Sequence, residues 1–434
     1  MKAVKYHRYI TKKIETFIKS RFPKVILLIR FYYFYWKYRI VKLLIRFAYS
    51  SRRKNGNGKI LTLCLGGLGD VIHATPFYTS LKTAMPDCKL DAIVSMWVED
   101  LLKKNLPVIN RIVPYPINAK YMNNIMMWRF FRDLYIENYD YYFCIADYTY
   151  PPIVPHNLYG AVIGYVADIP ERVGIYRQRN SHFIKMERSL IEKIHLYTRF
   201  GFDELGFHGS DNHSVFQHLH LLKIVGIEPD SHDLVLYPDP VSDVAIERYL
   251  DGFVKYNDLV ILLAPTSASL VKQWSHMKFA ELADRLASDF GAKIVIACSE
   301  AEKVGELIKI MMNNKSLSFS GDNALSLPQF VSLAKRSHLC IGNDSGATHA
   351  AIAVSTPVVM LFGASPVNFA KPLDEKKHRF LVASDFLNPI QQNNKLSESE
   401  EKRNIDLITV DAVYDACVSI LKSEYPQFYK RLIH

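Results

Sequence analysis

Cysteine is scarce in this sequence, and its spacing suits neither a metal site nor a redox pair. Six cysteines occur in 434 residues, without a Cys-x-x-Cys pair or a Cys/His ligand pattern. Most of them stand in apolar runs typical of buried strands, where a free cysteine behaves as a small apolar side chain. We therefore expect no zinc centre and no redox site, which suits a reducing, cytoplasmic setting.

Acidic residues are almost absent from the first 55 residues. This segment holds sixteen Lys or Arg and a single acid, Glu15, whereas the whole chain carries a net charge of +11. The rest of the chain is therefore slightly acidic. A nucleic-acid-binding function of the folded part of the chain is disfavoured, because contacts with phosphates would be confined to residues 1–55.

A long uncharged apolar run is also missing. Residues 25–49 are rich in aliphatic and aromatic side chains, but five Lys or Arg interrupt them. A membrane span needs about 20 predominantly apolar residues, so we expect none here. No small-residue cleavage site follows, which argues against a signal peptide. Residues 1–55 are predicted to lie helically in the interface of an anionic membrane. A helical extension packed on protein is the alternative.

Strand and helix patterns alternate through the rest of the chain. Near-continuous apolar runs, as in strands buried on both faces, alternate with helical patterns at the spacing of βαβ units. This predicts an α/β protein with two doubly wound, Rossmann-like domains facing across a cleft. We place the first domain at 56–240 and the second at 241–385. Residues 386–434 are expected to form a polar loop and a helix packing back toward the first domain.

A glycine-rich turn follows the first predicted strand. Gly66, Gly67 and Gly69 permit a tight turn and close approach of a ligand, and Asp70 falls in the first turn of the next helix. Ligands of parallel sheets bind beyond the carboxyl ends of the strands. Asp70 could face such a ligand or simply cap its helix. The turn does not match a P-loop.

A second strand–turn–helix pattern reads GNDSGATH, at 342–349. Backbone N–H groups at such a helix N-terminus suit a diphosphate, although Asn343 and Asp344 could cap the helix instead. Lys272, after the strand at 259–264, could neutralise a leaving diphosphate or be a solvated lysine. Glu300, after the strand at 293–297, could bind ribose hydroxyls or be a helix N-terminal acid.

Taken in order, these motifs resemble glycosyltransferase family 9, the ADP-heptose:lipopolysaccharide heptosyltransferases. The matching segments cover about residues 59–372 and leave out residues 1–55. They are LGGLGDVIHATPFYTSLKTAMPDCKLDAIVS, ERVGIY, LAPTSASLVKQWSHMKFAELADRL and IGNDSGATHAAIAVSTPVVMLFG. The chain departs from the family in one loop, where Pro265-Thr266-Ser267 replaces a frequent Pro-Gly-Ala.

The resemblance implies a GT-B fold and an inverting, metal-independent transfer with no cofactor. The acceptor would bind the first half and a nucleotide sugar the second, with Asp70 as the catalytic base. Arg172, Arg177 and Arg179 are candidate contacts for a phosphorylated or Kdo-bearing lipid acceptor, or plain surface charges. The implied donor-binding residues are Thr266, Lys272, Glu300, Asp344, Ser345, Gly346, Ala347 and His349.

The expected function is transfer of a sugar, heptose from ADP-heptose first, to a lipopolysaccharide core or related glycan. The enzyme would work at the inner face of the cytoplasmic membrane. Another nucleotide sugar, or a capsular, O-antigen or protein acceptor, remains open, as does an inactive membrane-associated adaptor. A nicotinamide-dependent dehydrogenase is disfavoured, because the GxGxxG spacing and the acid after the second strand are absent.

Overall fold

The computed structural model describes residues 23–54, 58–115, 124–146, 158–175, 204–206, 213–299, 304–363, 365–386 and 404–430. Contacts divide the chain into two compact units. One comprises Met1–Leu63 and Pro116–Leu205, and the other Cys64–Tyr115 and Gly206–His434. The predicted domain limits at 240 and 385 stay a prediction.

The strands form two six-stranded sheets with parallel pairing. The first runs β3-β2-β1-β4-β5-β6 and the second β9-β8-β7-β10-β11-β12, so both have the Rossmann order 3-2-1-4-5-6. The predicted Rossmann-like sheets are confirmed. The strands are β1 (Lys59–Cys64), β2 (Lys89–Ser95), β3 (Arg111–Tyr115), β4 (Tyr141–Ala146), β5 (Glu171–Ile175), β6 (Glu204–Gly206), β7 (Val260–Ala264), β8 (Lys293–Ala297), β9 (Ser316–Phe319), β10 (Leu339–Asn343), β11 (Val358–Phe362) and β12 (Arg379–Val382).

Helices connect the strands, as the sequence pattern predicted. Those of the first unit are α2 (Pro23–Tyr49), α6 (Asn124–Glu137) and α7 (Leu158–Val166). Those of the second are α3 (Leu68–His73), α4 (Thr75–Ala84), α5 (Glu99–Asn105), α10 (Ser214–Ile224), α11 (Pro240–Leu250), α12 (His276–Phe290), α13 (Val304–Met311), α14 (Leu327–Arg336), α15 (Gly346–Ala353), α16 (Val367–Ala370), α19 (Val410–Glu424) and α20 (Pro426–Tyr429).

The segment after the glycine-rich turn forms two helices, α3 and α4, that meet at Ala74. Pro76 lacks an N–H and so cannot bond the carbonyl of Ile72 as a continuous helix requires. The Thr75 hydroxyl donates to that carbonyl instead, at 2.7 Å. The break makes α3 a six-residue helix that carries Asp70 and His73 directly after the glycine turn.

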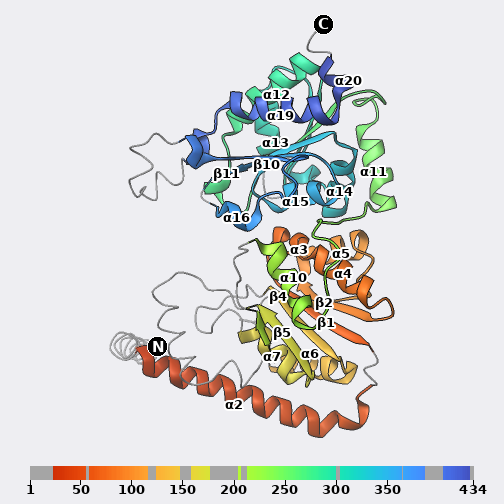
Figure 1. Cartoon of the computed structure of the whole chain (residues 1–434), viewed down its shortest axis with the longest axis vertical. Helices are drawn as coiled ribbons and strands as arrows, with labels where there is room; N and C mark the ends of the chain where they lie inside the picture. The colour runs from red at the N-terminus through yellow and green to blue at the C-terminus, as the bar shows by residue number, and fades with distance from the viewer. Residues whose placement is uncertain are drawn as a thin grey trace, which may run out of the picture. The chain divides into compact units, whose positions relative to one another are not determined.

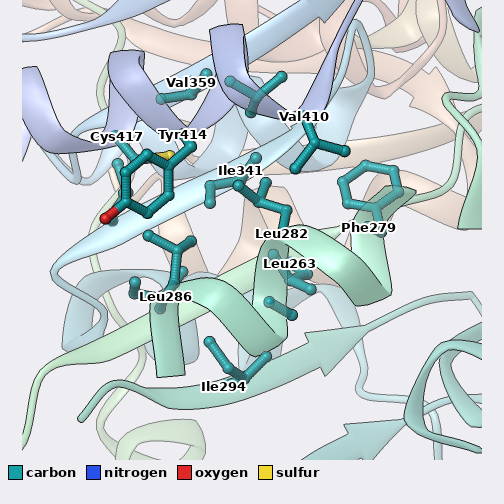
Figure 2. Packing of buried hydrophobic residues seen from close by; sticks show 14 of the residues in the cluster. Leu263, Phe279, Leu282, Leu286, Ile294, Ile341, Val359, Val410, Tyr414 and Cys417 are labelled. Atoms are coloured by element: carbon teal, nitrogen blue, oxygen red, sulfur yellow. The ribbon is translucent and has the colours of Figure 1, made fainter. Parts of the chain in front are cut away.

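The core of the second unit contains the last long helix of the chain. Figure 2 shows Tyr414 and Cys417 of α19 packed with Leu282 and Leu286 of α12 in one buried cluster. α19 contacts α12, β11 and β12, because its apolar face completes the hydrophobic layer that α12 forms on the second sheet. The expected packing of this helix toward the first domain stays a prediction.

The N-terminal helix α2 packs against α6 and α7 within the first unit (Figure 1). Its inner face buries Tyr38 and Ile45. Lys42 forms an ion pair with Asp168, with a nitrogen–oxygen distance of 2.7 Å. The described part of the basic extension is therefore attached to the folded body by one face of the helix.

Candidate functional site

The GGLGD turn holds the Asp70 side chain in place. Gly67 is the N-cap of α3, and its backbone N–H donates to Asp70 Oδ2 at 2.9 Å. A Cβ on Gly66 would lie 2.5 Å from Asp70 Cβ, which no real contact tolerates. Asp70 therefore does cap its helix, and the same bond fixes the orientation of its carboxylate at the wall of a pocket.

That pocket has a volume of about 620 Å³ and lies in the second unit. Most of the predicted site residues line it. It is bordered by the GGLGD turn, the loop after β7, the end of β8 and the GNDSGATH turn. The predicted residues that line it are Gly67, Gly69, Asp70, Thr266, Lys272, Asp344, Ser345, Gly346, Ala347 and His349. Gly66 does not line the pocket itself.

Four other predicted residues are not placed in the pocket. Glu300, Arg177 and Arg179 lie outside the described residues, although Ser299, just before Glu300, lines the pocket. Arg172 lies on β5 in the first unit, where its guanidinium donates to the backbone carbonyls of Ile169 and Pro170. Its suggested contact with an acceptor stays a prediction.

Asp344 is the electrostatic centre of the GNDSGATH turn. Its Oδ2 lies 2.7 Å from Lys272 Nζ, and its Oδ1 lies 3.5 Å from His349 Nε2. Burial alone would raise the pKa of this carboxyl, but His349 and Lys272 together hold it well below the ordinary value. Asp344 is therefore a carboxylate held by Lys272 and His349, and among the described residues its side chain does not cap the helix.

The cap of α15 comes from other residues of the motif. Ser345 is the N-cap, and its N–H donates to Thr348 Oγ1 at 3.3 Å. Asn343 joins β10 to the loop after β7, because its amide donates to the Pro265 carbonyl and its oxygen accepts from Trp274 N–H. The N-terminus of α15 is thereby held open toward the pocket.

Sequence reasoning missed His73. Its Nε2 lies 3.1 Å from His349 Nδ1, its Nδ1 contacts Ser214 Oγ, and it lines the same pocket. Gly69 makes the close packing possible, since a Cβ there would lie 3.2 Å from the His349 ring. The one signal in the sequence is spacing: His73 follows Asp70 by three residues, which places both on one face of a helix.

Comparisons with known proteins point to one family. Residues 237–398 match a model described as glycosyltransferase family 9 (heptosyltransferase). Lipopolysaccharide heptosyltransferase 2 of Salmonella typhimurium is 22% identical over 332 residues, covering 73% of this chain and 86% of that protein. Lipopolysaccharide heptosyltransferase 3 of Escherichia coli is 24% identical over 369 residues, covering 82% and 96% respectively.

Solved structures agree on the fold. A glycosyl transferase family 9 protein from Veillonella parvula superposes with a TM-score of 0.65 at 19% identity, covering 85% of this chain and 98% of that one. The ADP-heptose lps heptosyltransferase II of E. coli gives a TM-score of 0.60 at 21% identity, covering 84% and 99%. Together with the two Rossmann-ordered sheets, these likenesses confirm the predicted GT-B fold.

Proposed function

Because this chain belongs to glycosyltransferase family 9, and is thus a glycosyltransferase, we propose that it is an inverting heptosyltransferase acting on a lipopolysaccharide core or related glycan. The observation that carries the proposal is one pocket holding both a fixed carboxylate and an anion site. Asp70 lines it from one side, and Lys272 and the N-terminus of α15 from another. The proposed donor is ADP-heptose, for which the similar heptosyltransferase II of E. coli is named.

The donor's diphosphate would bind at the N-terminus of α15. The backbone N–H groups of Gly346 and Ala347 and the helix dipole favour an anion there. Ser345 Oγ is buried and has no hydrogen-bond partner among the described residues, so it is available to a ligand. Lys272, about a third exposed, adds a cation at the rim. Glu300 is the proposed ribose contact.

Asp70 would act as the general base. It accepts the proton of the acceptor hydroxyl while that oxygen attacks the anomeric carbon, and the bond from that carbon to the diphosphate oxygen breaks. The departing diphosphate is stabilised by Lys272 and the N–H groups of α15. A single displacement without an enzyme nucleophile inverts the anomeric configuration. With these donors in place, the proposed reaction needs no metal ion and no cofactor.

Calorimetry against ADP, UDP and GDP tests the donor assignment. We expect ADP to bind at least about tenfold more tightly than the other two, a difference of about 1.4 kcal/mol. Transfer from ADP-heptose to a deacylated core acceptor should then be measurable by ADP release. Tighter binding of UDP or GDP than of ADP would mean that the donor sugar is linked to that nucleotide instead. A protein that binds no nucleotide would be an adaptor, and the proposal would fail.

The outer face of α2 supports the further proposal that the enzyme binds an anionic membrane surface. Trp36, Ile40, Leu43, Leu44 and Phe47 recur at helical spacing, and all are at least half exposed. Their face is opposite the one that packs on α6 and α7. No described helix is sufficiently long and apolar to cross a bilayer.

Basic side chains border this apolar stripe. On a helical projection Lys37 lies on one flank, and Arg39 and Arg46 lie on the other. Residues 1–55 contain only one acid to oppose them. An apolar face with cations at its edges suits burial at headgroup depth in an anionic leaflet, at the inner face of the cytoplasmic membrane.

Liposome flotation tests the outer face of α2 directly. A Leu43→Glu, Phe47→Glu variant of the full chain should lose flotation with anionic vesicles. The matched control is Tyr256→Glu, which adds an acid at a fully exposed aromatic residue of the other unit. Equal flotation of the α2 variant and the control would overturn the membrane proposal, as would equal binding to neutral and anionic vesicles.

A further inference from the structure

The pocket has a polar end and an apolar end, and the proposed contacts with the donor leave the apolar end unassigned. Lys272, Asp344 and the N-terminus of α15 lie at the polar end, after β7 and β10. The apolar end is formed by α5, the end of β8 and the start of α14, which contribute Leu101, Ala297, Leu325, Leu327, Phe330 and Val331. All six belong to one hydrophobic cluster or pack against it, so this apolar wall is preformed.

The strand order arranges the two ends of the pocket along one edge of the second sheet. The order β9-β8-β7-β10 separates β10 from β8 by two strand spacings, about 10 Å. A diphosphate at the N-terminus of α15 lies beyond β10, and the ribose contact proposed at Glu300 follows β8. The base of the same nucleotide would therefore extend past β8 toward α14, where the apolar wall lies.

Helix packing within the second unit assigns different side chains to the two ends. α3, which carries Asp70, packs against α15 at the polar end. α5, which begins directly after the residues 96–98, packs against α14 at the apolar end. The proposed proton transfer at Asp70 therefore belongs to the polar end, and a side chain next to α5 faces the part of the pocket that the base would occupy.

Trp97 is that side chain. It lies in the short 3₁₀-helix η2 (Met96–Val98) between β2 and α5, and it lines the pocket. Its side chain is 51% exposed, whereas Phe330 on the opposing helix is 8% exposed. A single exposed tryptophan is ordinary on a protein surface. One whose exposed surface forms part of an apolar pocket is available to a flat, aromatic group of a ligand.

We propose that Trp97 stacks on the base of the donor nucleotide at the apolar end of the pocket. The inference rests on the proposed function, because it requires the diphosphate to lie at the N-terminus of α15. Every base has a π face, so Trp97 contributes affinity without selecting one base over another. Its contribution is to hold the nucleoside while Asp70 and the N-terminus of α15 act at the other end of the donor.

Calorimetry of the full chain with ADP and with inorganic pyrophosphate separates the base from the diphosphate. Trp97→Ala should bind ADP at least about fivefold more weakly than the wild type and bind pyrophosphate equally well. Trp97→Phe keeps an aromatic ring and should recover most of the ADP affinity. The matched control is Met96→Ala, because Met96 is 61% exposed and does not line the pocket; its affinities should equal those of the wild type.

Tryptophan fluorescence is a second readout, which does not depend on a change in affinity. The chain has four tryptophans, and Trp97 is the one that lines the pocket. A stacked base should quench its emission, so saturating ADP should quench the wild type and Met96→Ala but lose most of this effect in Trp97→Phe. Equal quenching of the wild type and Trp97→Phe would overturn the proposal, as would a loss of pyrophosphate affinity in Trp97→Ala equal to its loss of ADP affinity.

Transfer kinetics distinguish this inference from the proposed function. Trp97→Ala should raise the KM for the donor at least about fivefold with kcat nearly unchanged, the pattern of lost uniform binding. A raised KM for the acceptor with unaltered nucleotide affinity would place Trp97 at the acceptor and overturn the proposal. If UDP or GDP binds the wild type more tightly than ADP, the same variants are compared with that nucleotide. A wild type that binds a nucleotide no better than Trp97→Ala refutes this inference alone, whereas a wild type that binds no nucleotide refutes the proposed function as well.

Discussion

The turns at 66–70 and 342–349 have the same local design, yet they hold their carboxylates by different means. Each follows a parallel strand, contains glycine and opens a helix. Asp70 is held by its own turn, through the Gly67 N–H. Asp344 is held by Lys272, which is 72 residues away, and by His349.

This difference separates the chemical roles of the two acids. A carboxylate whose pKa is held far below its ordinary range by cations is a poor proton acceptor, so Asp344 is unsuited to act as a base. The turn that is fixed locally can present Asp70 to a hydroxyl. The turn that is held by Lys272, from a distant part of the chain, can instead present positive charge to a phosphate. The comparison therefore favours chemistry at the first turn and donor binding at the second.

Apart from the replacement of Asp70 itself, the largest predicted effect comes from adding one methyl group to the first turn. In Gly66→Ala the new Cβ would lie 2.5 Å from Asp70 Cβ and 2.8 Å from its Oδ2, so the carboxylate must move. Displacing a reacting group by about 1 Å can cost about 100-fold in rate, and we expect that loss in transfer assays with ADP affinity unchanged. In the control Gly67→Ala the added Cβ lies 3.6 Å from Asp70 Oδ2 and should be tolerated. Equal transfer rates for Gly66→Ala and Gly67→Ala would show that the position of Asp70 set by the first turn does not control the reaction.

The corresponding glycine of the second turn should affect stability. A Cβ on Gly346 would lie 2.5 Å from both Cβ and Cγ of Leu68, where α15 packs on α3. Overpacking of this kind typically costs about 1–3 kcal/mol, and we expect about 2 kcal/mol in urea unfolding of Gly346→Ala. Adding Leu68→Gly should recover part of that loss. No recovery in the double variant would mean that the strain arises elsewhere.

Removing the cation that pairs with Asp344 should weaken donor binding modestly. Lys272→Met retains the side-chain length but leaves Asp344 paired with His349 alone. We expect about a tenfold loss in ADP affinity by calorimetry, about 1.4 kcal/mol, as for a partly exposed charge-assisted contact. Lys278→Met is a matched control, because Lys278 bonds backbone carbonyls of 406 and 408 and does not line the pocket. An unaltered affinity in Lys272→Met would remove Lys272 from the donor site.

The smallest effect concerns a buried histidine, His378, that is held neutral. Burial lowers the pKa of His378 from 6.5 to about 4, and its Nδ1 accepts from Val358 N–H. A lowered pKa means that this histidine stabilises the fold fully above about pH 6.5, and that the stabilisation is lost as the pH falls toward 4. Between about pH 8 and pH 5.5 the loss should be about 1 kcal/mol.

Urea unfolding at those two pH values checks this expectation. In His378→Gln the amide oxygen can still accept from Val358 N–H, but the pH-dependent contribution is absent. The variant should therefore show a smaller difference in unfolding free energy between the two pH values than the wild type. The same difference in both proteins would show that His378 is not held neutral.

The sequence predicted the fold and the position of the pocket because both follow from local patterns. Buried strands alternate with helices, and the carboxyl ends of parallel strands share one edge of a sheet. Pro76 is a local signal of the break between α3 and α4, because proline lacks the N–H that a continuous helix needs. The packing of α19 on α12 and the second sheet was not predicted, because an amphipathic helix does not indicate which apolar surface it will cover.

The side-chain network of the pocket could not be predicted in this way. Asp344 seemed equally suited to a helix cap, and only the fold brings Lys272 to it. His73 stands in an apolar helical pattern that suggests a core residue, and its partners Ser214 and His349 are 141 and 276 residues away. Contacts at such separations depend on how the elements pack, and no local pattern encodes them.

The most direct test of the two roles is a paired measurement on Asp70→Asn: single-turnover transfer and ADP-heptose affinity in the same preparation. The amide can still accept from Gly67 N–H, so the turn should persist, but it cannot take a proton. We predict an unchanged affinity and a transfer rate lower by about 100- to 10,000-fold. Transfer at the wild-type rate, or loss of donor affinity equal to the loss of rate, would contradict the assignment of chemistry to the first turn and donor binding to the second.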